Sequence, residues 1–390
     1  MKKYGLIGKK LTYSYSLIIH NYLLKHHNIS ASYDLVEVDS ISYELLNSYD
    51  GLNITIPFKE EVKQYLNNKL VLPCNTIKKN NNKLFGFNTD QYGFKYLLKN
   101  SEDLTINKVV ILGSGASAKM IQSLLPNKDI IVISRNDSYY NYDNITEFDG
   151  DLLINTTPIG MSEYLSPLPE TCLKKYQAVI DLNYNPLNSK LALDCKKIGL
   201  NFINGLDMLI IQAIKSFEIW HDIKVAYTLK KAIYQEVLKR SQKKIALIGL
   251  SLSGKTTIVK KFNGLDLDEE ISLHYQESIA TMIENNTFRK REQDTLKKLV
   301  NNDVRLLACG GGIVLDHENM IILKDYLIIY LKSDYQSLAA RLNKEKRPLL
   351  QNEKQLKQMV KDRTFLYERY ANLTLTSQEL EVFLSEISYS

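Results

Sequence analysis

The feature that most constrains the fold of this 390-residue chain is a glycine-rich loop in its second half. The apolar run KKIALIGL leads into Gly249-Leu-Ser-Leu-Ser-Gly254-Lys255-Thr256-Thr257, which satisfies the pattern G-x-x-x-x-G-K-[ST]. Such a loop follows a buried strand and opens a helix, because its backbone N–H groups must converge on the phosphates of a nucleotide. Lys255 would then reach the outer phosphates, and the Thr256 hydroxyl would bind Mg²⁺.

Apolar runs alternate with helical stretches along the whole chain. The runs expected to form strands are residues 5–8, 34–38, 51–57, 108–115, 129–135, 151–157, 178–184, 243–250, 304–312 and 326–332. This alternation indicates an α/β architecture with mostly parallel sheets. A Lys-rich stretch at 221–244, with apolar residues at helical spacing, predicts a helix that closes the first part of the chain.

Composition and charge exclude several classes of protein. The hydrophobic content of 44% is close to that of globular proteins, and no apolar run approaches the ~18 residues of a membrane span. The start, MKKYGLIGKK, enters a strand without a signal-peptide core, so we expect a cytoplasmic protein with no membrane partner. The net charge of +6 is scattered rather than gathered in a stripe, which argues against nucleic acid and suits anionic small substrates.

The cysteines do not indicate a metal or a disulfide framework. The four residues are Cys74, Cys172, Cys195 and Cys309, with no C-x-x-C pairing and no histidine at zinc spacing. They fit a reducing compartment and no structural metal.

Motifs downstream of the glycine-rich loop add an acceptor site. They are Asp266-Leu-Asp268, Phe288-Arg289 with Glu292, Gly310-Gly311-Gly312, Arg347-Pro-Leu-Leu, and Arg363 with Tyr367. In this order they make residues 241–390 resemble shikimate kinase. The resemblance implies a P-loop NTPase domain of the nucleoside monophosphate kinase type, which would phosphorylate the 3-hydroxyl of shikimate with ATP and Mg²⁺.

The same resemblance implies roles for individual residues. Lys255 and Asp268 would be catalytic, with Asp268 orienting the shikimate hydroxyl, and Thr256 and Asp266 would organise Mg²⁺. Shikimate would be held by Asp268, Arg289, Gly311, Gly312 and Arg363, since the Arg fork matches a carboxylate. ATP would be held by Gly249, Ser251, Ser253, Gly254, Lys255, Thr256, Thr257 and Arg347.

This part departs from the kinase pattern in its loop and its length. Leu252 stands where the family usually has Gly, and Leu rarely accepts a positive φ. Lys255 and Asp266 are also closer in sequence than usual. The alternative is therefore a kinase-like domain that is non-catalytic or regulatory.

In the first part, the strand KVVILGSG runs into Gly113-Ser-Gly115-Ala-Ser-Ala118, a turn that should open a helix and face a pyrophosphate. The next strand ends at Ser134-Arg135-Asn136, where an NAD enzyme would place an acidic residue. An Arg at that point favours a 2′-phosphate, so the residues predict NADP(H). The candidate cofactor residues in this region are Gly113, Ser114, Gly115, Ala116, Ser117, Ala118, Ser134, Arg135 and Asn136.

Small polar motifs lie upstream, each at the end of an apolar stretch. They are Ser14-Tyr-Ser16, Asn53-Ile-Thr55 with Lys59, Asn75-Thr76 and Asn88-Thr89-Asp90. A pocket at the carboxyl edge of a sheet would collect such groups for a polyhydroxylated ligand. Taken singly, each motif is equally typical of a turn or a helix cap.

With Asn155-Thr-Thr-Pro-Ile-Gly-Met161, Asp181-Leu-Asn-Tyr184-Asn-Pro186 and the stretch Gly205–Ala213, these motifs resemble shikimate dehydrogenase from about Lys3 to Trp220. The resemblance implies that Lys59 and Asp90 form the catalytic pair and that Gly205 and Met208 meet the cofactor. The residues it places around shikimate are Ser14, Ser16, Asn53, Thr55, Lys59, Asn75, Asp90, Tyr184 and Gln212. An ammonium suits ketone reduction, because it stabilises the developing alkoxide and then protonates it.

The two resemblances imply consecutive reactions in one chain: reduction of 3-dehydroshikimate to shikimate and phosphorylation of shikimate. We expect a substrate-binding subdomain at 1–100, a Rossmann-like NADP-binding subdomain at 101–240 and a P-loop domain at 241–390. The expected partners are small-molecule substrates, and the chain is expected to be a monomer or a homodimer.

Overall fold

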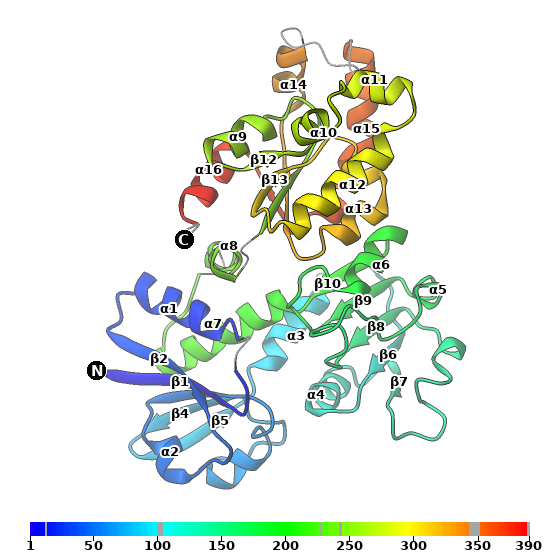
Figure 1. The fold of residues 1–390 in the computed structure, drawn as a ribbon. Helices are drawn as coiled ribbons and strands as arrows, with labels where there is room; N and C mark the ends of the chain where they lie inside the picture. The colour runs from blue at the N-terminus through cyan, green and yellow to red at the C-terminus, as the bar shows by residue number, and fades with distance from the viewer. Residues whose placement is uncertain (12–13, 100–103, 227, 242–243, 343–351, 388–390) are drawn as a thin grey trace. The chain divides into compact units, whose positions relative to one another are not determined.

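The chain forms two compact units, Met1–Leu238 and Lys239–Ser390, in the computed structural model (Figure 1). The structure describes all residues except 12–13, 100–103, 227, 242–243, 343–351 and 388–390. The first unit holds two five-stranded sheets and the second unit holds one. The expected α/β class is confirmed.

The first sheet of the first unit has the order β2-β1-β3-β4-β5. Its strands are β1 (Lys2–Gly8), β2 (Ala31–Glu37), β3 (Gly51–Ile54), β4 (Thr76–Asn80) and β5 (Lys83–Phe87). β1 pairs in parallel with β2 and β3, whereas β4 runs antiparallel to β3 and β5. The β3 end and the β4 start therefore meet at one edge of the sheet.

The second sheet is parallel throughout, with the order β10-β9-β8-β6-β7. Its strands are β6 (Lys108–Leu112), β7 (Asp129–Ile133), β8 (Leu152–Asn155), β9 (Ala178–Asp181) and β10 (Asn201–Asn204). Alternate residues of β6 enter two different cores: Val109 and Ile111 pack in one, Val110 and Leu112 in the other. A sheet buried on both faces explains why its strands read as continuous apolar runs.

The sheet of the second unit is also parallel, with the order β12-β13-β11-β14-β15. Its strands are β11 (Ile245–Ile248), β12 (Leu265–Asp266), β13 (Leu306–Ala308), β14 (Leu327–Leu331) and β15 (Leu373–Leu375). The central strand β11 is the one that precedes the glycine-rich loop.

Helices connect the strands and cover the sheets (Figure 1). Those up to the end of the first unit are α1 (Ser16–His26), α2 (Tyr43–Asn47), α3 (Asp90–Lys99), α4 (Ala116–Leu124), α5 (Glu170–Leu173), α6 (Lys190–Ile198), α7 (Leu206–His221) and α8 (Leu229–Ser241). The rest are α9 (Lys255–Lys261), α10 (Leu267–Tyr275), α11 (Ile279–Glu284), α12 (Phe288–Asn301), α13 (His317–Ile322), α14 (Tyr335–Leu342), α15 (Glu353–Tyr370) and α16 (Ser377–Ser385). Within the described residues, no helix is both long and apolar enough to cross a membrane.

The closing helix is shorter than the expected span of 221–244. α7 runs to His221 and ends at Asp222, whose φ of 54° is left-handed, and the next helix, α8, begins only at Leu229. A residue in that conformation ends the helical hydrogen-bond pattern. The apolar residues keep their helical spacing beyond Asp222, but the helix does not continue through it.

Helix α7 ends in an aromatic cluster that contains the buried imidazole of His20 and the half-buried imidazole of His221. The ring of His20 stacks on Tyr33 at 4.2 Å and lies 5.0 Å from Trp220, the chain's single tryptophan. Burial lowers the pKa of His20 to about 3 and that of His221 to about 4. Both rings are therefore neutral in the folded protein at mildly acidic pH.

We expect the first unit to lose stability as the pH falls from about 6.5 towards 4. In that window the unfolded chain binds protons at His20 and His221 and the folded chain does not, so acid favours unfolding by up to about 1.4 kcal/mol per pH unit for each ring. Urea unfolding followed by Trp220 fluorescence measures the slope. His20→Phe should flatten it and His26→Phe, at an exposed ring, should not; equal slopes in the two variants would contradict this explanation.

Candidate functional site

A polar cavity of about 210 Å³ lies in the first unit and gathers residues from both of its sheets. The first sheet contributes residues at and after the end of β3, before β4 and at the start of α3. The second sheet contributes residues of α4, of the loop after β9 and of α7 with the residue before it. The lining residues are Asn53, Ile54, Thr55, Lys59, Asn75, Asp90, Ser117, Leu182, Tyr184, Gly205, Met208, Leu209 and Gln212. The cavity thus brings predicted substrate residues together with Ser117, Gly205 and Met208, which were predicted to meet the cofactor.

Lys59 and Asp90 form a close pair in this cavity. Lys59 Nζ donates to Asp90 Oδ2 at 2.6 Å, and the two side chains are 16% and 17% exposed. Asn75 Nδ2 donates to the other carboxylate oxygen at 2.8 Å. Asp90 is the first residue of α3, so the helix dipole also favours its negative charge. The carboxylate is held on both oxygens and in turn orients the ammonium.

A network of buried side-chain hydrogen bonds supports this pair. Asn53 Nδ2 donates to Ser216 Oγ at 3.0 Å, and the Tyr33 hydroxyl donates to Asn53 Oδ1 at 2.9 Å. Ser216 lies 2.8 Å from Thr76 Oγ1 and 3.1 Å from Thr89 Oγ1. Sequence reasoning missed Ser216; its spacing of four residues from Gln212, on the same face of α7, was the available signal.

Ser14 and Ser16 lie outside the residues that line the cavity. Ser16 opens α1 and is buried, and its backbone N–H donates to Ser14 Oγ at 3.3 Å. The Ser16 side chain acts to lower the pKa of Tyr33, whereas burial, the larger effect, raises it. Tyr33 in turn donates to Asn53 in the network. Tyr184 does reach the cavity, and burial raises its pKa to about 12, so it is a neutral phenol.

The loops after β8 and β9 are braced against each other. Asn155 Nδ2 donates to Asp181 Oδ1 at 2.9 Å, and Asn183 Nδ2 donates to the carbonyls of Thr157 and Ile159 at 3.0 and 3.1 Å. Burial raises the pKa of Asp181 to about 7. The brace positions the loop that carries Tyr184.

The predicted cofactor turn has the backbone that such a turn needs. Gly113 has a φ of 96°, and its N–H donates to the carbonyl of Ile133 at 2.8 Å, which ties the turn to the end of β7. Gly115 is the N-cap of α4, whose first turn holds Ala116, Ser117 and Ala118, and Ser114 is exposed before it. Ser134, Arg135 and Asn136 follow β7 directly, and Arg135 is exposed. These groups fit a dinucleotide phosphate at the helix N-terminus with a second anionic group near Arg135.

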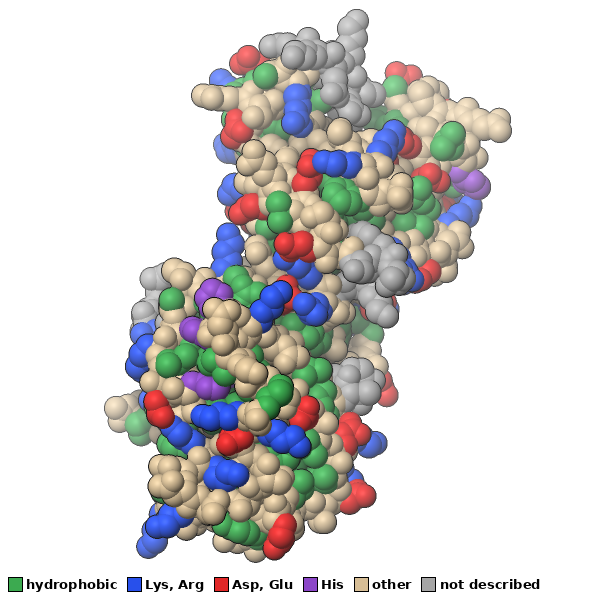
Figure 2. Space-filling view, turned by 90° about the vertical axis from the view of Figure 1, so that its left-hand side faces the viewer, with side chains coloured by type: hydrophobic (Ala, Val, Ile, Leu, Met, Phe, Trp, Pro, Cys, Tyr) green, Lys and Arg blue, Asp and Glu red, His purple; other side chains and the backbone are tan. Residues whose placement is uncertain are grey.

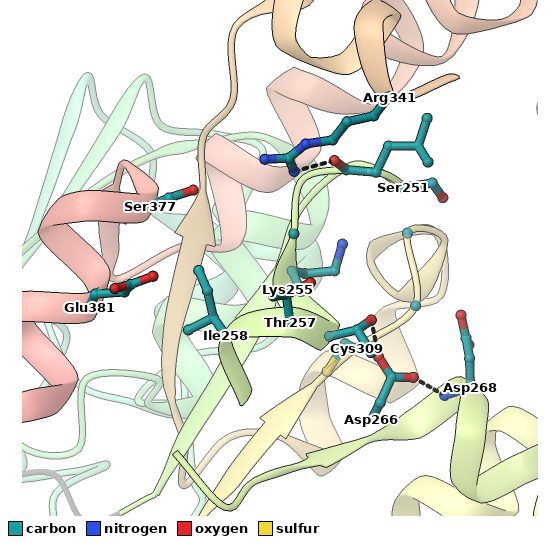
Figure 3. A pocket seen from close by; sticks show the side chains of 15 residues that line it. Ser251, Lys255, Thr257, Ile258, Asp266, Asp268, Cys309, Arg341, Ser377 and Glu381 are labelled. Carbon is teal, nitrogen blue, oxygen red and sulfur yellow. Dashed lines mark hydrogen bonds between the residues drawn. The ribbon is translucent and has the colours of Figure 1, made fainter. Parts of the chain in front are cut away.

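The second unit has a cavity of about 360 Å³ at the carboxyl edge of its sheet (Figure 3). The glycine-rich loop forms its floor. Lys255 is buried, and its Nζ donates to the carbonyls of Gly249 and Leu250, each at 2.8 Å, and to Ser253 Oγ at 3.3 Å. Leu252 adopts a φ of 69°, the left-handed conformation a glycine would take, and Arg341 donates to its carbonyl at 2.7 Å.

The predicted metal residues touch each other beside the loop. Thr256 Oγ1 donates to Asp266 Oδ2 at 2.6 Å, while Asp266 Oδ1 caps α10 by accepting from the N–H groups of Asp268 and Glu269. A hydroxyl and a carboxylate are oxygen donors of the kind Mg²⁺ takes, together with waters and phosphates. Among the described residues there is no group of three or more His, Cys, Asp or Glu side chains that could hold a metal by themselves.

Of the predicted acceptor residues, Asp268 and Gly311 line the same cavity, whereas Arg289, Gly312 and Arg363 lie outside its lining. A Cβ on Gly310 would lie 2.7 Å from Asp268 Oδ1, and one on Gly311 would lie 2.8 Å from Ser251 Oγ, so a side chain at either position would displace one of these groups. Arg363 Nη1 donates to the Gly311 carbonyl at 3.1 Å. Gly312 packs against the guanidinium of Arg289.

Arg289 is held by a buried carboxylate. Its Nη1 donates to Glu292 Oε2 at 2.7 Å, and Glu292 is fully buried. Burial raises the pKa of Glu292, and the guanidinium acts in the opposite direction. The Glu292 carboxylate therefore holds the guanidinium of Arg289, one of the two arginines predicted to bind the substrate carboxylate.

Some nucleotide-side residues differ from the prediction. Arg347 lies outside the described residues. Arg341, Ser377 and Glu381 line the cavity and were not predicted, since no local motif marks them. Thr257 lines the cavity as expected.

Known protein families match both units of the chain. The shikimate kinase family matches residues 252–388, and the shikimate dehydrogenase substrate binding domain matches residues 6–77. Shikimate dehydrogenase (NADP(+)) of Clostridium beijerinckii is 35% identical over 262 residues, which cover 60% of this chain and 97% of that protein.

Solved structures give the same assignment for the first unit. A chorismate mutase/shikimate 5-dehydrogenase fusion protein from Clostridium acetobutylicum is 34% identical, with a TM-score of 0.57, over 62% of this chain and 98% of that one. Shikimate dehydrogenase 1 from Peptoclostridium difficile is 30% identical, with a TM-score of 0.56, over 61% of this chain and 98% of that one. The chain therefore belongs to the shikimate dehydrogenase family and carries a shikimate kinase family domain in its second unit.

Proposed function

We propose that the chain reduces 3-dehydroshikimate to shikimate with NADPH in its first unit and phosphorylates shikimate with ATP in its second. The observation that carries the first activity is the Lys59–Asp90 pair in a cavity shared with Ser117, Gly205 and Met208. The observation that carries the second is the convergence of Lys255, Thr256, Asp266 and Asp268 on one cavity.

In the first unit, NADPH held at the Gly113 turn would supply a hydride to the ketone carbon. The ketone oxygen gains negative charge as this happens, and the Lys59 ammonium stabilises that charge and donates a proton to it. Asp90 holds the Lys59 ammonium in place through the 2.6 Å contact, so that it can face the ketone oxygen. Asn53, Thr55, Asn75, Tyr184 and Gln212 offer hydrogen bonds to the hydroxyl and carboxylate groups of the substrate. Ser14 and Ser16 are assigned to the same substrate by the resemblance to shikimate dehydrogenase.

The cofactor preference rests on Arg135. Arg135 follows β7, whose last residue, Ile133, accepts a hydrogen bond from the N–H of Gly113. At this point in the fold a carboxylate would select the free 2′-hydroxyl of NAD, and a cation suits the 2′-phosphate of NADP. A shikimate dehydrogenase that is 28% identical has been solved in complex with NADP+. We assign substrate binding to residues 1–100 and cofactor binding to residues 101–240.

In the second unit, Asp268 orients the shikimate 3-hydroxyl for attack on the terminal phosphate of ATP. Phosphoryl transfer needs positioning and neutralisation of charge, which Lys255 and the loop N–H groups supply. Mg²⁺, held by Thr256 and Asp266, would supply further positive charge on the phosphates. Arg289 and Arg363 hold the substrate carboxylate against the Gly311–Gly312 backbone, and Arg347 is assigned to ATP by the resemblance to shikimate kinase.

Neither rival function gains support from the geometry. A non-catalytic kinase domain was motivated by Leu252, but Leu252 takes the backbone conformation that a glycine would take, at a cost on the order of 1 kcal/mol. Nucleic-acid binding calls for a basic stripe, whereas on the face shown in Figure 2 basic and acidic side chains are interspersed. A cytoplasmic location and a monomeric or homodimeric state stay predictions.

Lys59→Ala should lower kcat for shikimate oxidation by NADP+ by roughly 10²–10⁴, because the proton transfer loses its acid–base group. NADPH absorbance at saturating substrate measures this. Lys63→Ala removes a lysine whose ammonium contacts Glu60 and the carbonyl of Val71, and should leave kcat within about twofold. Equal losses in both variants, or none in Lys59→Ala, would exclude Lys59 as the acid.

Asp268→Asn should lower the rate of shikimate phosphorylation by roughly 10² or more and leave dehydrogenase activity unchanged, since a misoriented hydroxyl loses its alignment with the phosphate. Mass spectrometry of shikimate 3-phosphate formed from shikimate and Mg-ATP gives the rate. The matched control is Glu270→Gln, two residues further along α10, which should phosphorylate normally. Unimpaired phosphorylation by Asp268→Asn would refute the assigned role.

A further inference from the structure

The cavity lined by the glycine-rich loop, where we propose that ATP binds, is called the nucleotide cavity. The order of strands in the second unit gives it two different ends. β12 and β13, on one side of the central strand β11, lead into Asp266–Asp268 and Gly310–Gly312. β14 and β15, on the other side, lead to α14 and α16. The phosphate loop lies between the two sides. A nucleotide whose terminal phosphate faces Asp268 therefore has its nucleoside on the β14–β15 side.

The cavity extends to α16 on that nucleoside side. Ser377 and Glu381 line it from one face of the helix, four residues apart. Figure 3 shows them across Lys255 and Thr257 from Asp266 and Asp268. Ile258, in the first turn of α9, lines the wall on the way from Thr257 towards Glu381.

A carboxylate is unfavourable in a cavity for a polyanion unless it meets hydrogen-bond donors. Glu381 Oε2 is paired with Lys261 Nζ at 2.6 Å, which holds the side chain in place while it remains 42% exposed. The donors of a nucleoside are the two ribose hydroxyls and the N–H groups of the base. The ribose is joined directly to the α-phosphate, so it is the part that leaves the phosphate loop first and meets this wall.

We propose that Glu381 binds the ribose hydroxyls of the phosphoryl donor, with Ser377 beside it, and so selects ribonucleotides over their deoxy forms. Carboxylates serve the same purpose for ribose in dinucleotide-binding folds. This inference rests on the proposed phosphotransferase function of the second unit. Glu381 is a binding residue and takes no part in the transfer of the phosphoryl group.

The test compares the affinity of the full chain for ADP and for 2′,3′-dideoxy-ADP by calorimetry, with NADP+ present to fill the first unit. A hydrogen bond to a charged group predicts that ADP binds about tenfold more tightly. In Glu381→Ala the ratio should fall to about one, because affinity for ADP drops and affinity for the dideoxy form does not.

Two variants separate ribose recognition from a structural effect. Lys261→Ala removes the ion pair and keeps the carboxylate, so the preference for ADP should persist. Glu386→Gln changes a carboxylate just beyond the same helix, which pairs with Lys239 and does not line the cavity, and should leave the ratio unchanged.

Other results would overturn the inference in distinct ways. Equal binding of ADP and the dideoxy form by the unmodified chain excludes a ribose contact. Discrimination that survives in Glu381→Ala assigns it to another group, and a Glu381-dependent preference between ADP and GDP assigns Glu381 to the base. No binding of ADP at all contradicts the proposed kinase function itself and removes the ribose contact with it.

Discussion

The carboxyl edge of a parallel sheet is the constraint on which both sites depend. In each sheet the first strand in sequence lies inside the sheet, and its neighbours are strands from different points of the chain. The loops that leave such neighbouring strands diverge and open a crevice between them. The Gly113 turn follows β6 and the glycine-rich loop follows β11. Each opens a helix directly, so residues that are close in sequence are enough to place helix N–H groups at that crevice.

Charge placement then decides what each crevice can do. In the first unit, Asp90 is held by Asn75, Lys59 and the start of α3, so the ammonium keeps its partner in a cavity that excludes much of the solvent. In the second unit, Lys255 bonds to the carbonyls of its own loop, and Thr256 to Asp266. These contacts hold the groups in place before a ligand arrives, which reduces the cost of ordering them on binding.

Local sequence patterns predicted the fold class and the motif loops, because both depend on neighbouring residues. The apolar runs mark ten strands, and the structure has a strand in each of them. The short strands β4, β5, β10, β12 and β15 were not predicted. Of these, β12 has only two residues and β4 reads as TIKKN, so neither carries an apolar pattern. The helix expected at 221–244 failed at Asp222, where one left-handed residue interrupts the backbone without changing the apolar spacing.

The parts of the sites that sequence reasoning missed are long-range. Ser216 meets Asn53 across 163 residues, and Arg341 meets Leu252 across 89. Neither residue belongs to a motif. Ser216 had only its spacing of four residues from Gln212 as a signal and Arg341 had none, so the packing of α7 and α14 is what assigns them to the sites. Leu252 is the opposite case: a departure from the family pattern was visible in the sequence, but its backbone conformation was not.

The most direct test of the two activities gives the purified chain 3-dehydroshikimate, NADPH and Mg-ATP together and follows the products by mass spectrometry. If both units are active, shikimate 3-phosphate accumulates, with shikimate alone when ATP is omitted and neither product when NADPH is omitted. Shikimate alone in the complete mixture would contradict the proposed kinase activity, and would mean that the second unit has the fold and the residues of a kinase without the activity.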